Sequence, residues 1–313
     1  MNKKLKSTIF LMLTAIIWGT AFVAQREGMS SIGPFMFSAL RMYLGTLTLL
    51  PIIYITALRS RSAAKAFLPD EALKKAESRT LLQGGIWCGV IIFFAANFQQ
   101  VGLVSTSAGK TAFITTLYIL LVPLIGIFLK RKLSHNIWIG VAMGTLGLYF
   151  LCITESFAIA FGDLVVLIGA FFWAFHILCM DYYAPKVMVT KLIAIQFFIS
   201  GTLSLAVSLF TEPILLQSIL NAGPTIIYTG IMSSGIAFTL QGLGQKDANP
   251  TTASIILSTE ALFGAIAGYL FLAEVFTQRE FIGCVLMFSA VIIAQLPTKA
   301  ERQLKLHSES FGG

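Results

Sequence analysis

Charged side chains inside long apolar runs are the residues of this chain whose chemistry stands out. Glu260 lies ten positions into a run that begins near Pro250, about 15 Å along a helix. If the run crosses a membrane, charge is disfavoured at that depth, and we expect the carboxyl group to be protonated over much of the physiological range. The group could exchange a proton, contact a solute, or form a structural hydrogen bond beside the small residues Gly264 and Gly268.

Two cations lie in similar runs. Lys110 is near one end of its run, where it could attract an anionic or zwitterionic solute. Its long stem could equally carry the ammonium group to the membrane interface. Arg41 lies about 12 Å into the second run, which is too deep for the guanidinium to reach water fully. We therefore expect Arg41 to pair with Glu27 or a helix end, as a structural anchor.

Aromatic and uncharged polar residues form the second group of candidates. Trp173, His176 and Met180 share one helical stripe, and Trp18 lies on a matching stripe in the first run. Such stripes could line a cavity, although tryptophan near a membrane boundary is also an interface anchor.

Side-chain amides also occur inside the runs. Asn97 and Gln100 share one face of the third run, and Gln241 occupies the corresponding part of the eighth. These amides could bind a polar solute or link neighbouring helices.

Enzyme chemistry is not indicated. The spacing of His176 and Asp181 resembles the HxxxxD string of some acyltransferases, but residues i and i+5 of a helix point about 140° apart. The HExxH, GxSxG, Walker A and GxGxxG motifs do not occur. The four cysteines lie in or at the end of apolar runs without metal-ligand spacing, which indicates packing. We expect no catalytic residue, no metal and no cofactor.

Ten apolar runs must position these side chains. The chain is 57% hydrophobic and only 12% charged, with a mean hydropathy of +0.84, whereas soluble domains are about 25% charged. Each run can cross a hydrocarbon core of about 30 Å as a helix. We predict an all-α membrane protein with ten transmembrane helices, at residues 8–24, 33–57, 81–103, 107–129, 137–153, 162–184, 190–210, 223–245, 250–272 and 279–296.

The second half of the chain repeats the first. LTAIIWGTAFVAQ around Trp18 matches IGAFFWAFHILCM around Trp173, an offset of 155 that also carries Arg41 onto Gln196. GLVSTSAGKTAFITTLYILL from Gly102 matches GQKDANPTTASIILSTEALF, which begins 142 positions later.

An odd number of spans in each half means that the halves face opposite ways across the membrane. We predict two inverted five-helix repeats, at residues 1–156 and 157–298, followed by a tail at 299–313. Inverted repeats around a shared midplane site are typical of secondary transporters.

The basic residues predict the orientation. With a cytoplasmic N-terminus, 18 of the 22 Lys and Arg lie on the cytoplasmic side and two lie outside, as the positive-inside rule requires. We expect a multi-pass protein of the inner (plasma) membrane with both termini cytoplasmic. The net charge of +8 then reflects topology and contact with anionic lipid, not nucleic-acid binding. The first run is too long for the core of a signal peptide and is expected to be retained.

Several segments resemble a known family. WGTAFVAQ, ALRMYLG and STSAGKTAFITTLYILLVPLIGIFLKRKLS are similar to the first EamA repeat of the drug/metabolite transporter superfamily, and GDLVVLIGAFFWAFHIL and STEALFGAIAGYLFLAEVFT are similar to the second. The resemblance covers about residues 8–297. It implies ten helices, cytoplasmic termini, a central cavity and transport of small metabolites, often export. Many members carry an acid before a Pro in the fourth span; here Tyr118 precedes Pro123, while Glu260 is followed by Ala261.

The leading hypothesis is a secondary transporter that exports a small metabolite, an amino acid or a related polar or amphipathic solute, by alternating access. Protons could be the coupling ion, with facilitated exchange as the competing mechanism. A membrane-embedded lipid-modifying enzyme or a non-transporting membrane component is the alternative. The expected partners are the small-molecule substrate and the lipid bilayer, and the oligomeric state is left open. The candidate substrate-binding residues are Trp18, Asn97, Gln100, Lys110, Tyr118, Trp173, His176, Gln241 and Glu260.

The predicted orientation can be tested by cysteine labelling in a background that lacks the four native cysteines. A cysteine introduced by Ser62→Cys should react with an impermeant maleimide only after permeabilisation, because the loop 58–80 carries the largest basic cluster. A cysteine in the loop near Glu212 should react in intact cells. Labelling at position 62 in intact cells would contradict the orientation.

Overall fold

The computed structural model describes residues 3–63, 71–106, 108–131, 133–152, 161–272 and 277–296, and all regular structure within these ranges is helical. The first half contains α1 (Lys3–Met29), α2 (Pro34–Ala63), α3 (Glu71–Ser105), α4 (Ala108–Thr116), α5 (Tyr118–Phe128) and α6 (His135–Cys152). The second half contains α7 (Phe161–Tyr183), α8 (Val189–Thr211), α9 (Leu216–Asn221), α10 (Gly223–Tyr228), the π-helix η2 (Thr229–Ala237), α11 (Phe238–Gln245), α12 (Pro250–Leu257), α13 (Glu260–Leu272) and α14 (Gln278–Gln295).

The all-α membrane fold is confirmed. Within the described ranges, eight helical stretches are long and apolar enough to cross a membrane, and α14 contributes a shorter apolar helix, Phe281–Ala294. α6 packs along α14. The count of ten spans, which includes α6 and α14, stays a prediction. The expected tail at 299–313 and the loop around Glu155 lie outside the described residues.

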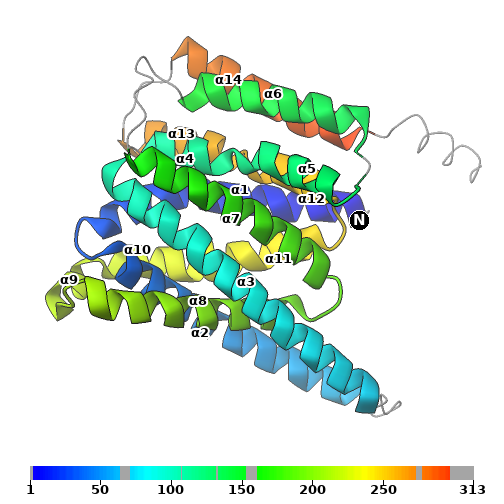
Figure 1. Cartoon of the computed structure of the whole chain (residues 1–313), viewed down its shortest axis with the longest axis vertical. Coiled ribbons are helices and arrows are strands. Elements are labelled where there is room, and N and C mark those ends of the chain that lie inside the picture. Colours follow the sequence, from blue (N-terminus) through cyan, green and yellow to red (C-terminus); the bar gives the residue numbers. More distant parts are fainter. Residues whose placement is uncertain are drawn as a thin grey trace, which may run out of the picture.

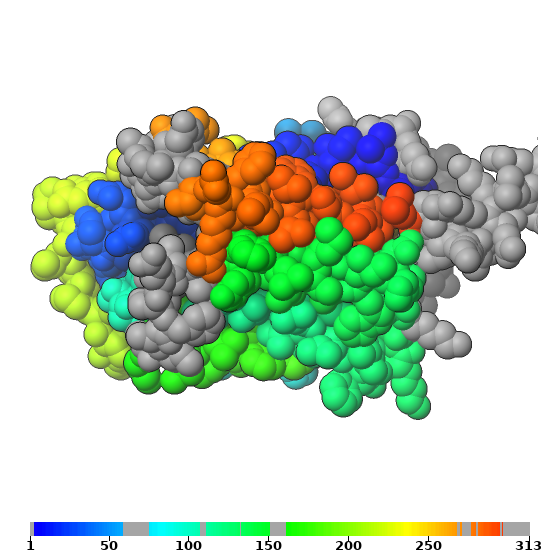
Figure 2. All heavy atoms as spheres, turned by 90° about the horizontal axis from the view of Figure 1, so that it is seen from above, coloured from blue at the N-terminus to red at the C-terminus, as the bar shows by residue number. Residues whose placement is uncertain are grey.

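The helices form a bundle with α6 and α14 side by side at one edge and α2 and α8 at the other, and the long α3 runs diagonally from that second edge towards α4 (Figure 1). The space-filling view from the first edge shows α14 and α6 packed along their length (Figure 2). α1, α7, α5, α11, α12 and α13 lie between these edges, where the largest apolar cluster of buried residues is centred.

Helix contacts pair the two halves in a regular way. α2 packs on α8 and α6 packs on α14, so each of these contacts joins corresponding helices. The contact of α3 with α7 has its counterpart in the contact of η2 and α11 with α1. A twofold exchange of the halves would produce these pairings. The bounds and inverted arrangement of the two repeats stay a prediction.

Two of the expected spans are broken at equivalent positions. α4 and α5 are separated at Leu117, and α12 and α13 at Ser258–Thr259, a shift equal to the 142-residue offset between the repeats. At each break the backbone makes a tighter i to i−3 bond, from Leu117 N and from Thr259 N. The hydroxyls of Thr116 and Thr259 also donate to carbonyls three or four residues earlier, and such bonds favour bending of a helix.

α1 is bonded along its length to the antiparallel segment η2–α11. Ser7 Oγ donates to Gly244 O over 2.6 Å, and Thr14 Oγ1 donates to Ala237 O over 3.0 Å. The π-helical geometry of η2 alters the normal i to i−4 bonding, and the accepting carbonyl of Ala237 lies within it. These bonds hold α1 and η2–α11 together as one unit.

Gly19 allows α1 to cross α13 at backbone contact. A Cβ atom at Gly19 would lie 2.6 Å from Glu260 O and 2.6 Å from Gly264 N. Both are backbone atoms of the same neighbouring helix, so neither can move aside as a side chain would. The absence of a side chain at Gly19 therefore sets how closely α13 approaches α1.

Gly19→Ala should lower the free energy of unfolding by about 1–3 kcal/mol, the usual cost of overpacking. Gly223→Ala is the control, because a Cβ atom there meets nothing within 4 Å. Thermal unfolding of the purified protein in detergent measures both variants. Equal stability of the two would contradict the close crossing of α1 and α13.

Candidate functional site

A small cavity lies where helices of both halves meet at the centre of the bundle. About 30 Å³ of it is open to the centre of a water molecule, which is room for about two waters. Its walls come from α1, α2, α3, α4, α5, α7, η2, α11 and α13. The lining residues are Trp18, Phe22, Gln25, Arg41, Gln99, Thr115, Tyr118, Trp173, Ser233, Phe238 and Glu260.

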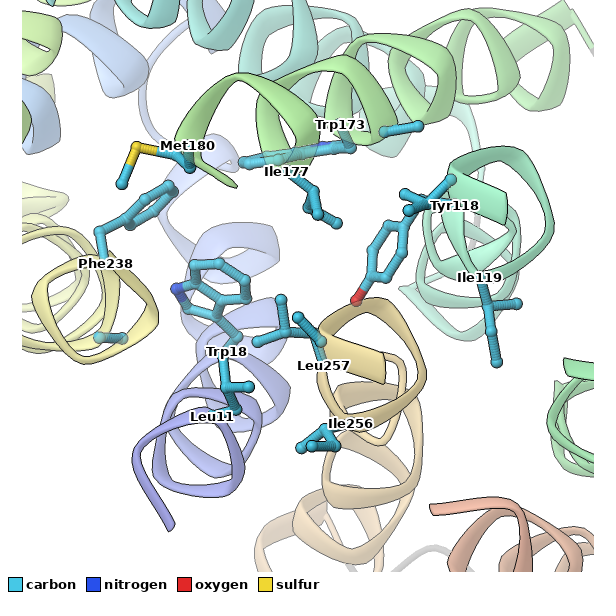
Figure 3. Packing of buried hydrophobic residues seen from close by; sticks show 14 of the residues in the cluster. Leu11, Trp18, Tyr118, Ile119, Trp173, Ile177, Met180, Phe238, Ile256 and Leu257 are labelled. Carbon is cyan, nitrogen blue, oxygen red and sulfur yellow. The ribbon is translucent and has the colours of Figure 1, made fainter. Parts of the chain in front are cut away.

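Three aromatic rings form one wall of the cavity. The ring centroids of Trp18 and Trp173 are 6.2 Å apart, and Phe238 lies 4.7 Å from Trp18 and 6.1 Å from Trp173. Figure 3 shows the three rings facing a common centre from α1, α7 and α11. The two tryptophans occupy positions that the repeat alignment matches, so each half contributes one.

The polar edges of both tryptophans are already bonded. Trp18 Nε1 donates to Ser233 O over 3.2 Å, and Trp173 Nε1 donates to Gln99 Oε1 over 2.7 Å. These bonds fix the orientation of the rings. The surfaces left for a ligand are the apolar ring faces, which favour contact with a flat or aliphatic group.

A carboxyl group and a phenol meet at another side of the cavity. Tyr118 Oη donates to Glu260 Oε1 over 3.0 Å, and the two side chains are 2% and 4% exposed. Each residue directly follows one of the two helix breaks, and the two are separated by the 142-residue repeat offset. Figure 3 shows the Tyr118 hydroxyl directed from α5 towards the α12–α13 region. The bond therefore joins equivalent positions of the two predicted repeats.

Arg41 supplies a cation to the same cavity. Its Nη1 donates to Gln25 Oε1 over 2.8 Å, and the residue is 5% exposed. The sequence suggested Glu27 or a helix end as its partner. The structure shows instead the amide of Gln25, which also lines the cavity, about one helical turn after Phe22. Within the described part of the chain, Arg41 forms no ion pair and its Nε has no hydrogen-bond partner.

The structure brings four of the candidate residues to the cavity: Trp18, Tyr118, Trp173 and Glu260. His176 lies beside it, bonded through Nε2 to Gln196 Oε1 over 3.2 Å, with its ring against Trp173 and Phe238.

The three candidate amides lie away from the cavity lining. Asn97 Nδ2 donates to Ser204 Oγ over 2.8 Å, which joins α3 to α8. Gln100 and Gln241 are buried, and their amide atoms have no partner among the described residues. Lys110 belongs to α4, and its side chain lies outside the described part of the structure.

The sequence analysis did not select seven of the lining residues: Phe22, Gln25, Arg41, Gln99, Thr115, Ser233 and Phe238. Gln99 illustrates the reason, because it is adjacent to the selected Gln100 but points about 100° away from it on the helix. The sequence could have indicated Gln25, because it lies seven positions after Trp18 and therefore on the same face of α1.

Membrane-length helices around a polar and aromatic cavity define the class of protein: an integral membrane protein whose centre can contact a small molecule. The EamA-like transporter family matches the chain twice, over residues 5–153 and 160–295. The chain therefore belongs to this family. It is a multi-pass membrane transporter with a small-molecule substrate, and not an enzyme.

Individual relatives agree with this assignment. An uncharacterized transporter of Archaeoglobus fulgidus is 29% identical over 304 residues, which cover 94% of this chain and 87% of the relative. The uncharacterized transporter YoaV of Bacillus subtilis is 23% identical over 92% of this chain and 96% of its own. A solved structure, described only as a crystal structure of a protein, has the same fold with a TM-score of 0.72 at 19% identity, covering 95% of this chain and 98% of that one.

If the aromatic wall contacts substrate, Trp18→Ala and Trp173→Ala should each weaken transport about 2- to 13-fold, because an aromatic contact contributes about 0.5–1.5 kcal/mol. Trp87→Ala is the matched control, because Trp87 is 59% exposed on the bundle surface whereas Trp18 and Trp173 are each 9% exposed. Uptake and efflux are measured at equal amounts of folded protein in the membrane. Normal transport by both cavity variants would assign the two rings a structural role alone.

Proposed function

We propose that this transporter exports a small amphipathic metabolite, an amino acid or a related solute, by alternating access through the central cavity. The observation that carries the proposal is the pairing at the cavity. Trp18 with Trp173, and Tyr118 with Glu260, bring residues of both halves into contact at one place. Inverted-repeat transporters bind their substrates at such an interface between repeats.

The small size of the cavity supports a mechanism in which the walls of the cavity move apart. A space that holds about two waters is far smaller than the pockets of about 300–1,000 Å³ that enclose metabolite-sized ligands. Binding a metabolite therefore requires the walls to separate. The breaks at Leu117 and at Ser258–Thr259 adjoin the cavity residues Tyr118 and Glu260, so bending there would change the cavity directly.

Glu260 is the proposed proton-coupling group. Its side chain lines the cavity, accepts one hydrogen bond from Tyr118, and forms no ion pair within the described residues. A carboxyl group without a cationic partner in an apolar bundle is stable when protonated and becomes costly when charged. Opening of the cavity to water on one side would allow the proton to leave.

The proposed setting is the inner (plasma) membrane with both termini in the cytoplasm. Its support is the distribution of basic residues along the chain, because positive charge is retained on the cytoplasmic side. Export, as implied by the family resemblance, would carry the solute from the cytoplasm to the outside.

The coupling role is tested by Glu260→Gln, because the amide resembles the protonated acid in shape and hydrogen bonding but cannot release a proton. Accumulation driven by a proton gradient should be lost, while exchange of substrate across the membrane without a gradient should persist. Glu27→Gln serves as the control, since Glu27 is an exposed acid near the end of α1.

Proteoliposomes that contain each variant allow both activities to be measured with the same protein. The solute is identified beforehand by comparing metabolites inside and outside cells that overproduce the chain, where export predicts selective depletion inside. Gradient-driven accumulation by Glu260→Gln at the unaltered rate would exclude Glu260 as the coupling group.

A further inference from the structure

Among the residues that the structure describes, no acid contacts Arg41 and balances its charge. A guanidinium group has five N–H donors and remains charged in proteins. One of these donors is used by Gln25 Oε1, and Nε has no partner among the described residues. A buried cation without an anionic partner is costly in an apolar bundle. An anion that entered the cavity would remove this cost.

Among the described residues that line the cavity, Glu260 is the one other carboxyl or cationic group. It faces the same space as Arg41, yet the two form no ion pair, and Glu260 bonds instead to Tyr118. With Glu260 protonated, the cavity carries a net positive charge. An anionic group that entered the cavity would therefore be attracted to the guanidinium of Arg41.

The remaining lining favours one kind of anion. A carboxylate matches the planar fork of an arginine with two parallel hydrogen bonds. Its single negative charge equals that of the one cation among the described lining residues. The unbonded ring faces of Trp18, Trp173 and Phe238 offer a surface for a flat apolar body. The indole N–H groups of the two tryptophans already donate to Ser233 O and Gln99 Oε1, so Arg41 is left as the donor for the anion.

We propose that Arg41 binds the carboxylate of a small organic acid whose flat apolar body packs against Trp18, Trp173 and Phe238. Gln25 is a positioning residue, because its amide oxygen holds the guanidinium in place over 2.8 Å. This inference rests on the proposed function, in which the central cavity is the transport site, and it names the substrate class of that site.

The test compares four ligands of one shape on the purified full-length protein: 3-phenylpropionate, 3-phenylpropionamide, 3-phenylpropylamine and phenylalanine. Binding is followed by calorimetry and by quenching of tryptophan fluorescence. The acid should bind about 10- to 100-fold more tightly than the neutral amide, the range expected for hydrogen bonds to a charged group. The amine should bind most weakly of the three non-zwitterionic ligands.

Variants assign the preference to one residue. Arg41→Gln should remove the difference in affinity between acid and amide. Arg41→Lys should retain part of this difference, since a lysine keeps the charge but lacks the planar fork. Arg79→Gln, at an exposed position near the start of α3, should bind all four ligands as the unaltered protein does. Phenylalanine that binds as tightly as the acid, or more tightly, supports the carboxylate site.

Equal binding of acid and amide by the unaltered protein, or preference for the amine, overturns the inference even if Arg41→Gln fails to fold. The proposed function fails separately. An acid that binds in an Arg41-dependent way but is never transported would leave the carboxylate site intact and refute transport through the cavity. Transport that depends on Trp18 and Trp173 without any preference for the acid would refute the carboxylate site and leave transport through the cavity intact.

Discussion

Lipid surrounds this bundle and offers its polar groups no hydrogen bonds, and that constraint shapes the whole structure. Backbone and side-chain polar groups inside a membrane protein must find partners within the protein. Ser7, Thr14 and Trp18 of α1 do so with carbonyls of η2 and α11, and Asn97 does so with Ser204 across α3 and α8. The central cavity brings together two ionisable groups with unused bonding capacity, Arg41 and Glu260, next to open space.

The same constraint indicates which elements of the bundle can move to open the cavity. α1 is bonded to η2–α11 along its length and crosses α13 at the backbone contact of Gly19, so these elements resist separation. The irregular backbone lies at Leu117, at Ser258–Thr259 and through η2. Non-helical or altered backbone at membrane depth is tolerated where it lines a cavity. Bending at the two equivalent breaks would open the cavity while the α1 unit stays intact.

The sequence predicted the all-α membrane fold and matched Trp18 with Trp173 as equivalent positions of two repeats, because long apolar runs and repeated segments can be recognised in a single chain. It could not predict which face of each helix is directed towards the centre of the bundle and which towards lipid. Lipid-facing and partner-facing sides are both apolar here, so the usual amphipathic signal is weak. Gln99 rather than Gln100 lines the cavity for this reason, and Arg41 pairs with Gln25 rather than with Glu27. The helix breaks at Leu117 and at Ser258–Thr259 could not be predicted either, because serine and threonine are common within membrane helices.

The central claim is that one cavity, shared by both halves, opens alternately to the two sides of the membrane. Labelling of Ser233→Cys in a background without native cysteines tests it most directly, because Ser233 lines the cavity and is 4% exposed. The account predicts reaction with an impermeant maleimide from outside in intact cells and from the cytoplasmic side in inverted vesicles, with both rates lowered by the transported solute. Ser38→Cys, fully buried outside the cavity lining, should stay unlabelled. Labelling of position 233 from neither side, or from one side only and unaffected by solute, would contradict the account.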